Sequence, residues 1–159
     1  MGETFMRMRK KKWAEPELNS CPFYVPDPRA VRGKWNGQFP EAKPLHVELG
    51  CGKGVSTAQM AFDQRDVNFV AVDLISDVLG VAKRNIEKSY GESRADNILL
   101  CIHDVARVSQ LFAPEDRVQR IYLSFPNPWN GRHRHQKRRL THPRQLMQYR
   151  EFLTDRGQI

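Results

Sequence analysis

A short apolar segment that runs into a glycine-rich turn constrains the fold of this chain more than any other feature. Leu45–Leu49 has the length and apolar character of a buried strand, and the turn Gly50–Gly54 follows it directly. Glycines at alternate positions let the backbone turn sharply and let a ligand approach where a Cβ would collide. The segment therefore predicts a strand–turn–helix unit of an α/β sheet with a ligand at the turn.

Strand and helix patterns alternate after this unit. The predicted strands are Asn68–Leu74, Ile98–Ile102, Arg120–Phe125 and one that opens at Gly157, and the predicted helices are Val55–Gln64, Asp77–Tyr90, a short one in Val105–Phe112 and one from Pro143 to about Asp155. Alternation of this kind predicts a Rossmann-like α/β fold, a parallel sheet with helices on both faces. We assign residues 41–159 to this domain.

The first 40 residues differ from the rest of the chain. A basic run that includes Arg7 and Arg9–Lys12 precedes five prolines between Pro16 and Pro40. Because prolines at this density disfavour regular helix, we expect an extended arm over residues 1–40 that lies on the body of the protein. Its aromatic residues, which could hold it there, are Trp13, Phe23, Tyr24 and Trp35.

Three acidic residues lie at or near the ends of the first three predicted strands. Glu48 precedes the glycine turn, Asp73 ends the second strand and Asp104 follows the third. An acid beside the turn would repel a pyrophosphate but can accept hydrogen bonds from an ammonium group. Asp73 could accept from both ribose hydroxyls and Asp104 from an adenine amino group. These acids, with Gly50, Gly52 and Gly54, predict a site for S-adenosylmethionine.

The competing interpretation is a nicotinamide dinucleotide site that uses the same Asp73. Dinucleotide folds have the spacing G-x-G-x-x-G, whereas this chain has G-x-G-x-G with Glu48 upstream. Both differences favour S-adenosylmethionine.

A proline-framed loop follows the fourth predicted strand, next to the expected methyl donor. Pro126 and Pro128 restrict the backbone on both sides of Asn127, which we predict to be the catalytic residue and to contact the cofactor, and Trp129 could stack on a base. A basic tract suited to phosphate contacts comes next, and its predicted substrate-binding side chains are Arg132, Arg134, Lys137, Arg138 and Arg139. The histidines of this region lack accompanying carboxylates or cysteines, so we expect no metal site.

The charge of the chain points to a polyanionic partner. Its 26 lysines and arginines exceed its 18 acidic residues by 8, which favours nucleic acid or an anionic membrane surface. No apolar run approaches the roughly 20 residues of a membrane span. The three widely spaced cysteines suit free thiols in a reducing cytoplasm, where we expect the protein to reside.

The chain resembles the bacterial tRNA (guanine-N7-)-methyltransferases along nearly its whole length. The matching segments are Arg7-Met8-Arg9 with Trp13-Ala14, Gly33-Lys34-Trp35-Asn36, Glu48–Gly54, Tyr122–Trp129 and Lys137–Leu140. The resemblance implies a class I methyltransferase fold and methyl transfer from S-adenosylmethionine to N7 of a variable-loop guanine in tRNA. It also implies cofactor roles for Glu48, Asp73 and Asp104.

The chain departs from the family pattern at three points. Asn127 stands where the family usually has Asp, and the loop from Asn130 to His135 is one residue longer, which leaves the match of Arg132 or His133 to the family's basic substrate contact open. The family also continues past the fifth strand, so we expect a C-terminally incomplete domain without the last strands of the sheet.

Two alternatives follow from these departures. One is an RNA-binding protein that keeps the cofactor fold with weak or no catalysis, which Asn127 favours. The other is a methyltransferase for an exocyclic amine, but the Asn-Pro-Pro-Tyr pattern of such enzymes does not match Asn-Pro-Trp. The oligomeric state does not follow from the sequence.

Overall fold

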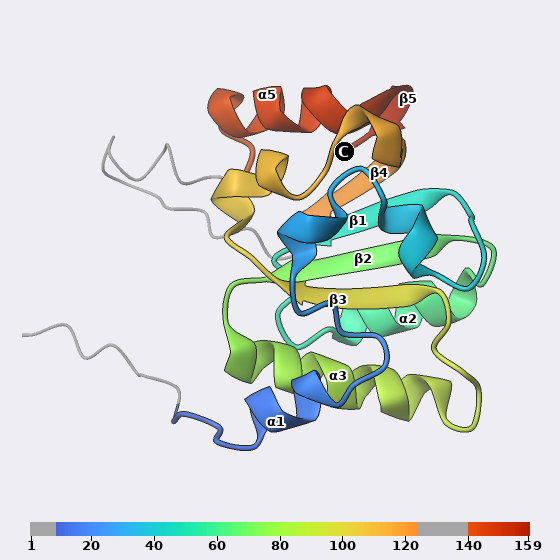
Figure 1. The fold of residues 1–159 in the computed structure, drawn as a ribbon, viewed down its shortest axis with the longest axis vertical. Coiled ribbons are helices and arrows are strands. Elements are labelled where there is room, and N and C mark those ends of the chain that lie inside the picture. The colour runs from blue at the N-terminus through green and yellow to red at the C-terminus, as the bar shows by residue number, and fades with distance from the viewer. Residues whose placement is uncertain (1–8, 124–139) are drawn as a thin grey trace, which may run out of the picture.

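A computed structural model describes residues 9–123 and 140–159, and its centre is a parallel β-sheet (Figure 1). The described strands are β1 Leu45–Leu49, β2 Asn68–Asp73, β3 Ile98–Ile102, β4 Val118–Leu123 and β5 Leu153–Gln158. Their order is β3-β2-β1-β4-β5, and every pair is parallel. The sequence-based prediction of a Rossmann-like α/β fold is thus confirmed.

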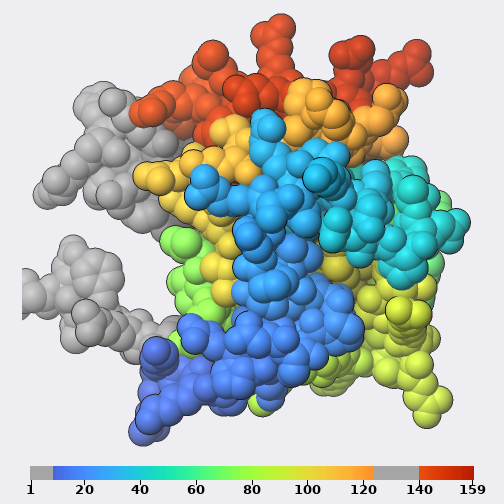
Figure 2. Space-filling model, in the orientation of Figure 1, coloured from blue at the N-terminus to red at the C-terminus, as the bar shows by residue number. Residues whose placement is uncertain are grey.

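Helices cover both faces of the sheet. The described α-helices are α1 Ala14–Asn19, α2 Val55–Asp63, α3 Ser76–Tyr90 and α5 Pro143–Phe152, and the 3-10 helices are η1 Pro28–Val31, η2 Trp35–Gln38, η3 Val105–Gln110 and η4 Pro114–Asp116. Right-handed crossovers place α2 and α3 on one face. The arm with η1 and η2 crosses the other face, where its side chains cover the middle of the view in Figure 2.

β1 is the point at which the direction of strand addition reverses, from β2 and β3 on one side to β4 and β5 on the other. β1 pairs with β2 on one side and with β4 on the other, so the chain leaves β1 in one direction and later returns in the other. In open α/β sheets, ligands bind beyond the carboxyl ends of the strands at this switch point. All five residues of β1 are buried, as expected for a strand covered on both faces.

The N-terminal arm is packed into the same core as the sheet. Trp35 is fully buried against Phe112, and its indole N–H donates to the Leu111 carbonyl at 2.8 Å. The buried Asp116 carboxylate accepts backbone N–H groups of Gly33 at 2.8 Å and Trp35 at 3.0 Å. For the described residues 9–40, the prediction that the arm lies on the body is confirmed, whereas the division into residues 1–40 and 41–159 stays a prediction.

The expectation that prolines would keep the arm free of regular helix was wrong over α1. Pro16 lies in the first turn of α1, where its missing N–H breaks no helical hydrogen bond, and Pro22 comes after the helix has ended. Ala14 and Leu18 are buried on one side of α1. Packing of this face against α3 therefore stabilises a helix of only six residues, which the proline count alone could not indicate.

The prediction at the last helix and strand was wrong by several residues. The helix ends at Phe152 rather than near Asp155, and β5 begins at Leu153 rather than Gly157. Leu153 has extended backbone and pairs with Val118 of β4. Pairing with β4 thus overrides the helical pattern of this segment, which is a tertiary effect.

Candidate cofactor site

The carboxyl ends of β1, β2 and β3 bring the predicted acids to one edge of the sheet. Glu48 lies near the end of β1, Asp73 ends β2 and Asp104 follows β3 by two residues. The turn that follows β1 lies at the same edge, which is the left side of Figure 1. The structure therefore gathers all the predicted cofactor residues that it describes.

The glycine turn has a left-handed backbone at its three glycines, which is how it turns as sharply as the sequence predicted. The φ angles are +75° at Gly50, +56° at Gly52 and +70° at Gly54. A Cβ on Gly50 or Gly52 would meet no atom within 4 Å, so these two glycines border open space that a ligand can enter. A Cβ on Gly54 would lie 2.7 Å from the Ala82 Cβ, so this glycine is needed for the contact between α2 and α3.

Asp73 fastens the glycine turn to the end of β2. Its Oδ2 accepts the Gly52 N–H at 2.9 Å, and its Oδ1 accepts the Ile75 N–H at 3.1 Å. Each carboxylate oxygen has a second lone pair. Asp73 can therefore hold the turn and still accept hydrogen bonds from a ligand's hydroxyl groups.

Glu48 lies beneath the turn rather than in front of it. Its side chain is 1% exposed, and the fully buried Thr57 of α2 donates a hydrogen bond to its Oε1. A buried carboxylate needs such donors, because an ion without them is costly to desolvate. The hydroxyl of Thr57 thus fixes the orientation of the carboxylate that the sequence assigned to the cofactor.

Asp104 has a capping role in the structure. Its side chain accepts the Ala106 N–H at 2.9 Å at the start of η3. The carboxylate is only partly buried and lies at the carboxyl end of β3, so it can also reach a ligand at this edge.

The two residues after Asp73 add an apolar surface that the sequence analysis did not single out. Leu74 is 58% exposed and Ile75 is 52% exposed, although both are large and apolar. Exposed apolar side chains beside a group of polar acceptors are typical of ligand sites. In the sequence, both residues directly follow Asp73 at the end of the second strand, and this position could have identified them as neighbours of the ligand.

Two further contacts that the sequence analysis missed stiffen the site. The Asn85 side chain of α3 donates to the Lys53 carbonyl at 2.7 Å and so holds the turn from another side. Burial, with the neighbouring carboxylates of Asp73 and Glu48, raises the pKa of the Cys51 thiol well above its usual value. Cys51 is therefore a neutral, packed thiol near neutral pH, not a nucleophile.

The donor set fits S-adenosylmethionine. The carboxylates of the site can accept from an α-ammonium group, ribose hydroxyls and an adenine amino group, and Gly50 and Gly52 leave room for the ligand. Within residues 9–123 and 140–159, no cluster of His, Cys, Asp and Glu could hold a metal ion. In that same part of the chain, no helix has the length and apolarity to cross a bilayer.

Several predicted residues lie outside the described part of the chain. These are Asn127, Trp129, Arg132, Arg134, Lys137, Arg138 and Arg139. The first described range ends before them at Leu123 of β4, and the second begins after them at Leu140, before α5.

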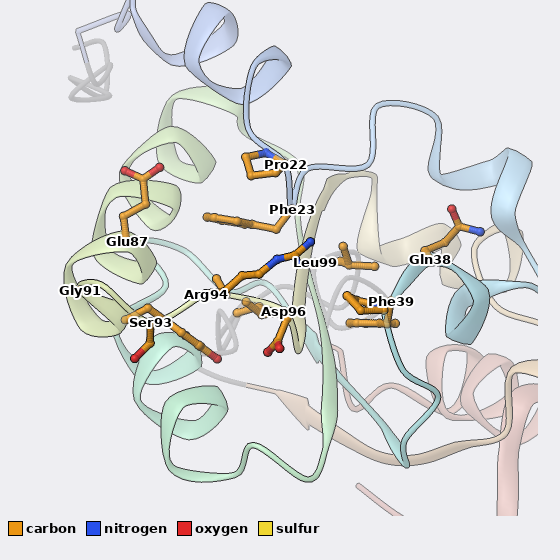
Figure 3. Close-up of a pocket in the computed structure, with 14 residues that line it drawn as sticks. Pro22, Phe23, Gln38, Phe39, Glu87, Gly91, Ser93, Arg94, Asp96 and Leu99 are labelled. Atoms are coloured by element: carbon orange, nitrogen blue, oxygen red, sulfur yellow. The ribbon is translucent and has the colours of Figure 1, made fainter.

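A cavity of about 570 Å³ lies at the opposite edge of the sheet. It is bounded by the last turn of α3, the start of β3 and the arm, and Arg94 reaches into it near Phe23 and Leu99 (Figure 3). None of the predicted site residues lines it. Its size alone therefore does not make it the functional site.

Comparison with known proteins gives consistent matches. A family model described as "putative methyltransferase" matches residues 42–159. The tRNA (guanine-N(7)-)-methyltransferase of Clostridium botulinum (strain Eklund 17B) is 47% identical over 156 residues, which are 97% of this chain and 71% of that protein. The protein of the same name from Clostridium beijerinckii is 49% identical over the same shares.

A solved structure supports the fold. The structure of PKMT2 from Rickettsia typhi in complex with AdoHcy superposes with a TM-score of 0.54, at 17% identity, over 86% of this chain and 24% of that one. At this identity the likeness concerns the fold alone.

The Thr57 hydrogen bond gives the first testable prediction. Thr57→Val keeps the shape of the side chain but removes the hydroxyl donor to Glu48. Because a buried carboxylate then loses a charge-assisted hydrogen bond of about 2 kcal/mol, we expect S-adenosylmethionine to bind roughly tenfold or more weakly. Titration calorimetry measures this affinity.

Thr57→Ser, which retains the hydroxyl, is the matched control and should bind within about threefold of the parent protein if the hydroxyl matters more than the methyl group. Equal affinities of the Val variant and the parent protein would show that Thr57 does not position Glu48.

Proposed function

The chain belongs to the tRNA (guanine-N(7)-)-methyltransferase family, and on this premise we propose that it transfers the methyl group of S-adenosylmethionine to N7 of a guanine in the variable loop of tRNA. The observation that carries the proposal is the joint placement of the glycine turn and three carboxylates at the switch point of the sheet. The excess of 8 positive charges suits a tRNA substrate.

The described residues would hold the methyl donor in a fixed orientation. S-adenosylmethionine, when bound, supplies an electrophilic methyl group on its sulfonium. Asp73 would accept the ribose hydroxyls, Asp104 the adenine amino group, and Glu48 the α-ammonium group directly or through water. The turn at Gly50–Gly54 would follow the ligand closely, since a Cβ at Gly50 or Gly52 would otherwise project into that space.

The reaction needs positioning more than proton transfer. Guanine N7 carries its own lone pair, so no proton must leave before it attacks the methyl carbon. The enzyme's contribution is then in-line placement of the two reactants in a preorganised pocket. The proposed chemistry therefore assigns no proton transfer to the carboxylates of the described edge.

Asn127 has a substrate-side role in this proposal. The purine becomes cationic as the new bond forms, and a nearby carboxylate would stabilise that charge. Asn127 keeps the shape and one acceptor oxygen of the family's usual Asp but lacks the charge. We therefore propose that the protein binds its cofactor normally and turns over slowly.

The product identifies the function directly. The protein is incubated with unmodified tRNA and labelled S-adenosylmethionine, and the tRNA is digested to nucleosides. We expect label in N7-methylguanosine and expect none after Asp73→Ala, because that variant loses both the turn contact and the ribose acceptor. Label in an exocyclic methylamine instead would favour the alternative substrate, and tRNA binding without label would favour a non-catalytic RNA-binding protein.

Asn127→Asp tests the proposed cause of slow turnover. Restoring the carboxylate should raise the single-turnover rate of methyl transfer by about tenfold or more, since the charge acts on the transition state. Single-turnover methylation of tRNA measures the rate. An unchanged rate would show that Asn127 is not a compromised electrostatic group.

A further inference from the structure

Helix α1 runs alongside α3 in the same direction. Ala14 lies opposite Gly80, where a Cβ on the glycine would be 2.7 Å from the Ala14 Cβ. One turn further on, the Glu17 carboxylate lies 3.5 Å from Lys83 and also pairs with Arg84 at 2.5 Å. In the Ala14–Gly80 and Glu17–Lys83 contacts, the two residues are 66 positions apart in the sequence. The segment before Ala14 is therefore level with the first turn of α3.

This alignment puts the basic run of the arm at the cofactor edge. The first turn of α3 begins at Ser76, three residues after Asp73. Residues 9–13 therefore lie level with the first turn of α3, and Figure 1 shows the chain entering α1 from the same side on which β2 and β3 end. Arg9, Lys10 and Lys12 are exposed there.

Contacts around Trp13 and Leu18 hold the arm in place. The Arg84 guanidinium lies 3.4 Å from the centre of the Trp13 ring, a cation–π contact, and Leu18 is 1% exposed. The hydrogen bond to Arg84 also lowers the pKa of Glu17, so this carboxylate stays charged. The basic run is thus attached to a fixed point on α3.

The cations of the run take no part in the ion pairs that the described residues form. Among the described residues, no ion pair includes Arg9, Lys10, Lys11 or Lys12. Positive charges before the first turn of a helix also oppose the helix dipole, so they do not stabilise α1. Ion pairs among the described residues and the dipole of α1 thus do not account for the placement of these cations.

We propose that Arg9–Lys12 form a phosphate-contact segment which α1 places beside the cofactor site, where it binds the sugar–phosphate backbone of the substrate RNA. This inference rests on the proposed function and names a binding surface for its substrate. Three other exposed cations share the edge: Lys53 in the glycine turn, Arg107 in η3 and Arg144 at the start of α5. Together they make a cationic rim on both sides of the cofactor residues.

An anionic membrane is the other polyanion to consider, and the arm is poorly suited to it. A membrane-binding segment needs apolar side chains that are free to insert. Trp13, the aromatic residue that follows the run, is instead packed against Gly80 and Arg84 of α3. Within the run itself, the exposed side chains are those of Arg9, Lys10 and Lys12, which fits phosphates on an RNA backbone.

The double variant Lys10→Ala/Lys12→Ala tests the contact. Binding of an unmodified tRNA transcript is measured by filter binding from about 50 to 300 mM salt. Because each lost phosphate contact lowers the salt slope by about 1, we expect the slope to fall by about 2 and the Kd to rise roughly tenfold at ~0.1 M salt. S-adenosylmethionine affinity should not change, since neither lysine contacts the cofactor residues.

Lys34→Ala/Lys88→Ala is the charge-matched control. Both lysines are exposed and lie toward the opposite edge, at the start of η2 and in the last turn of α3. If this control weakens tRNA binding as much as the arm variant, or if the arm variant binds tRNA like the parent protein, the proposal is overturned. Weaker binding to phosphatidylserine vesicles without a change in tRNA binding would also overturn it, in favour of a membrane.

A charge-neutral variant tests the placement by α1. Gly80→Leu would push Ala14 and α1 away from α3 without removing any cation. It should reproduce the lower salt slope while S-adenosylmethionine affinity is retained; Gly80→Ala is the smaller change if the leucine variant does not fold. Unchanged tRNA binding in a displaced variant would overturn the placement.

The methylated product is assayed separately from tRNA binding. A protein that binds tRNA through the arm but makes no N7-methylguanosine would therefore refute the proposed reaction and not the proposed contact.

Discussion

The hydrogen bonds of one carboxylate hold the functional edge of this protein together. Asp73 accepts the Gly52 N–H and the Ile75 N–H, so a single side chain joins the turn after β1 to the segment that leads from β2 into α3. Without this acceptor, the two N–H groups would need other partners in a partly buried place. The shape of the turn and the position of α3 thus depend on a residue that is also the predicted ribose acceptor.

The other parts of the structure support this edge from different sides. Thr57 orients Glu48 from α2, and Asn85 holds the Lys53 carbonyl from α3. α3 in turn carries α1, and through it the basic run at the start of the arm. The predicted cofactor residues Glu48 and Asp73 and the proposed RNA contact are therefore arranged around the same two helices. A substitution between α1 and α3 can be expected to affect RNA binding before it affects cofactor binding.

Much of the fold was predictable because it rests on local patterns. The strands Leu45–Leu49 and Ile98–Ile102 have the predicted bounds, since short apolar runs between turn residues leave little choice. α1 and the start of β5 were not predictable, because each depends on a surface that the sequence does not display: α3 for α1, and β4 for β5. In the site, glycine spacing predicted the sharp turn after β1, but the Thr57–Glu48 hydrogen bond required knowledge of where α2 lies over β1. The same holds for the Asp73–Gly52 contact, which joins residues 21 positions apart.

Hydrogen exchange of the Gly52 amide, measured by NMR without cofactor, tests most directly whether Asp73 holds the turn. In the parent protein this amide should be protected. In Asp73→Ala it should exchange at least about tenfold faster, the effect of losing a hydrogen bond to a charged acceptor, while amides within β1 and β2 keep their rates. Equal exchange of Gly52 in the two proteins would contradict the account, because the turn would then keep its shape without the carboxylate.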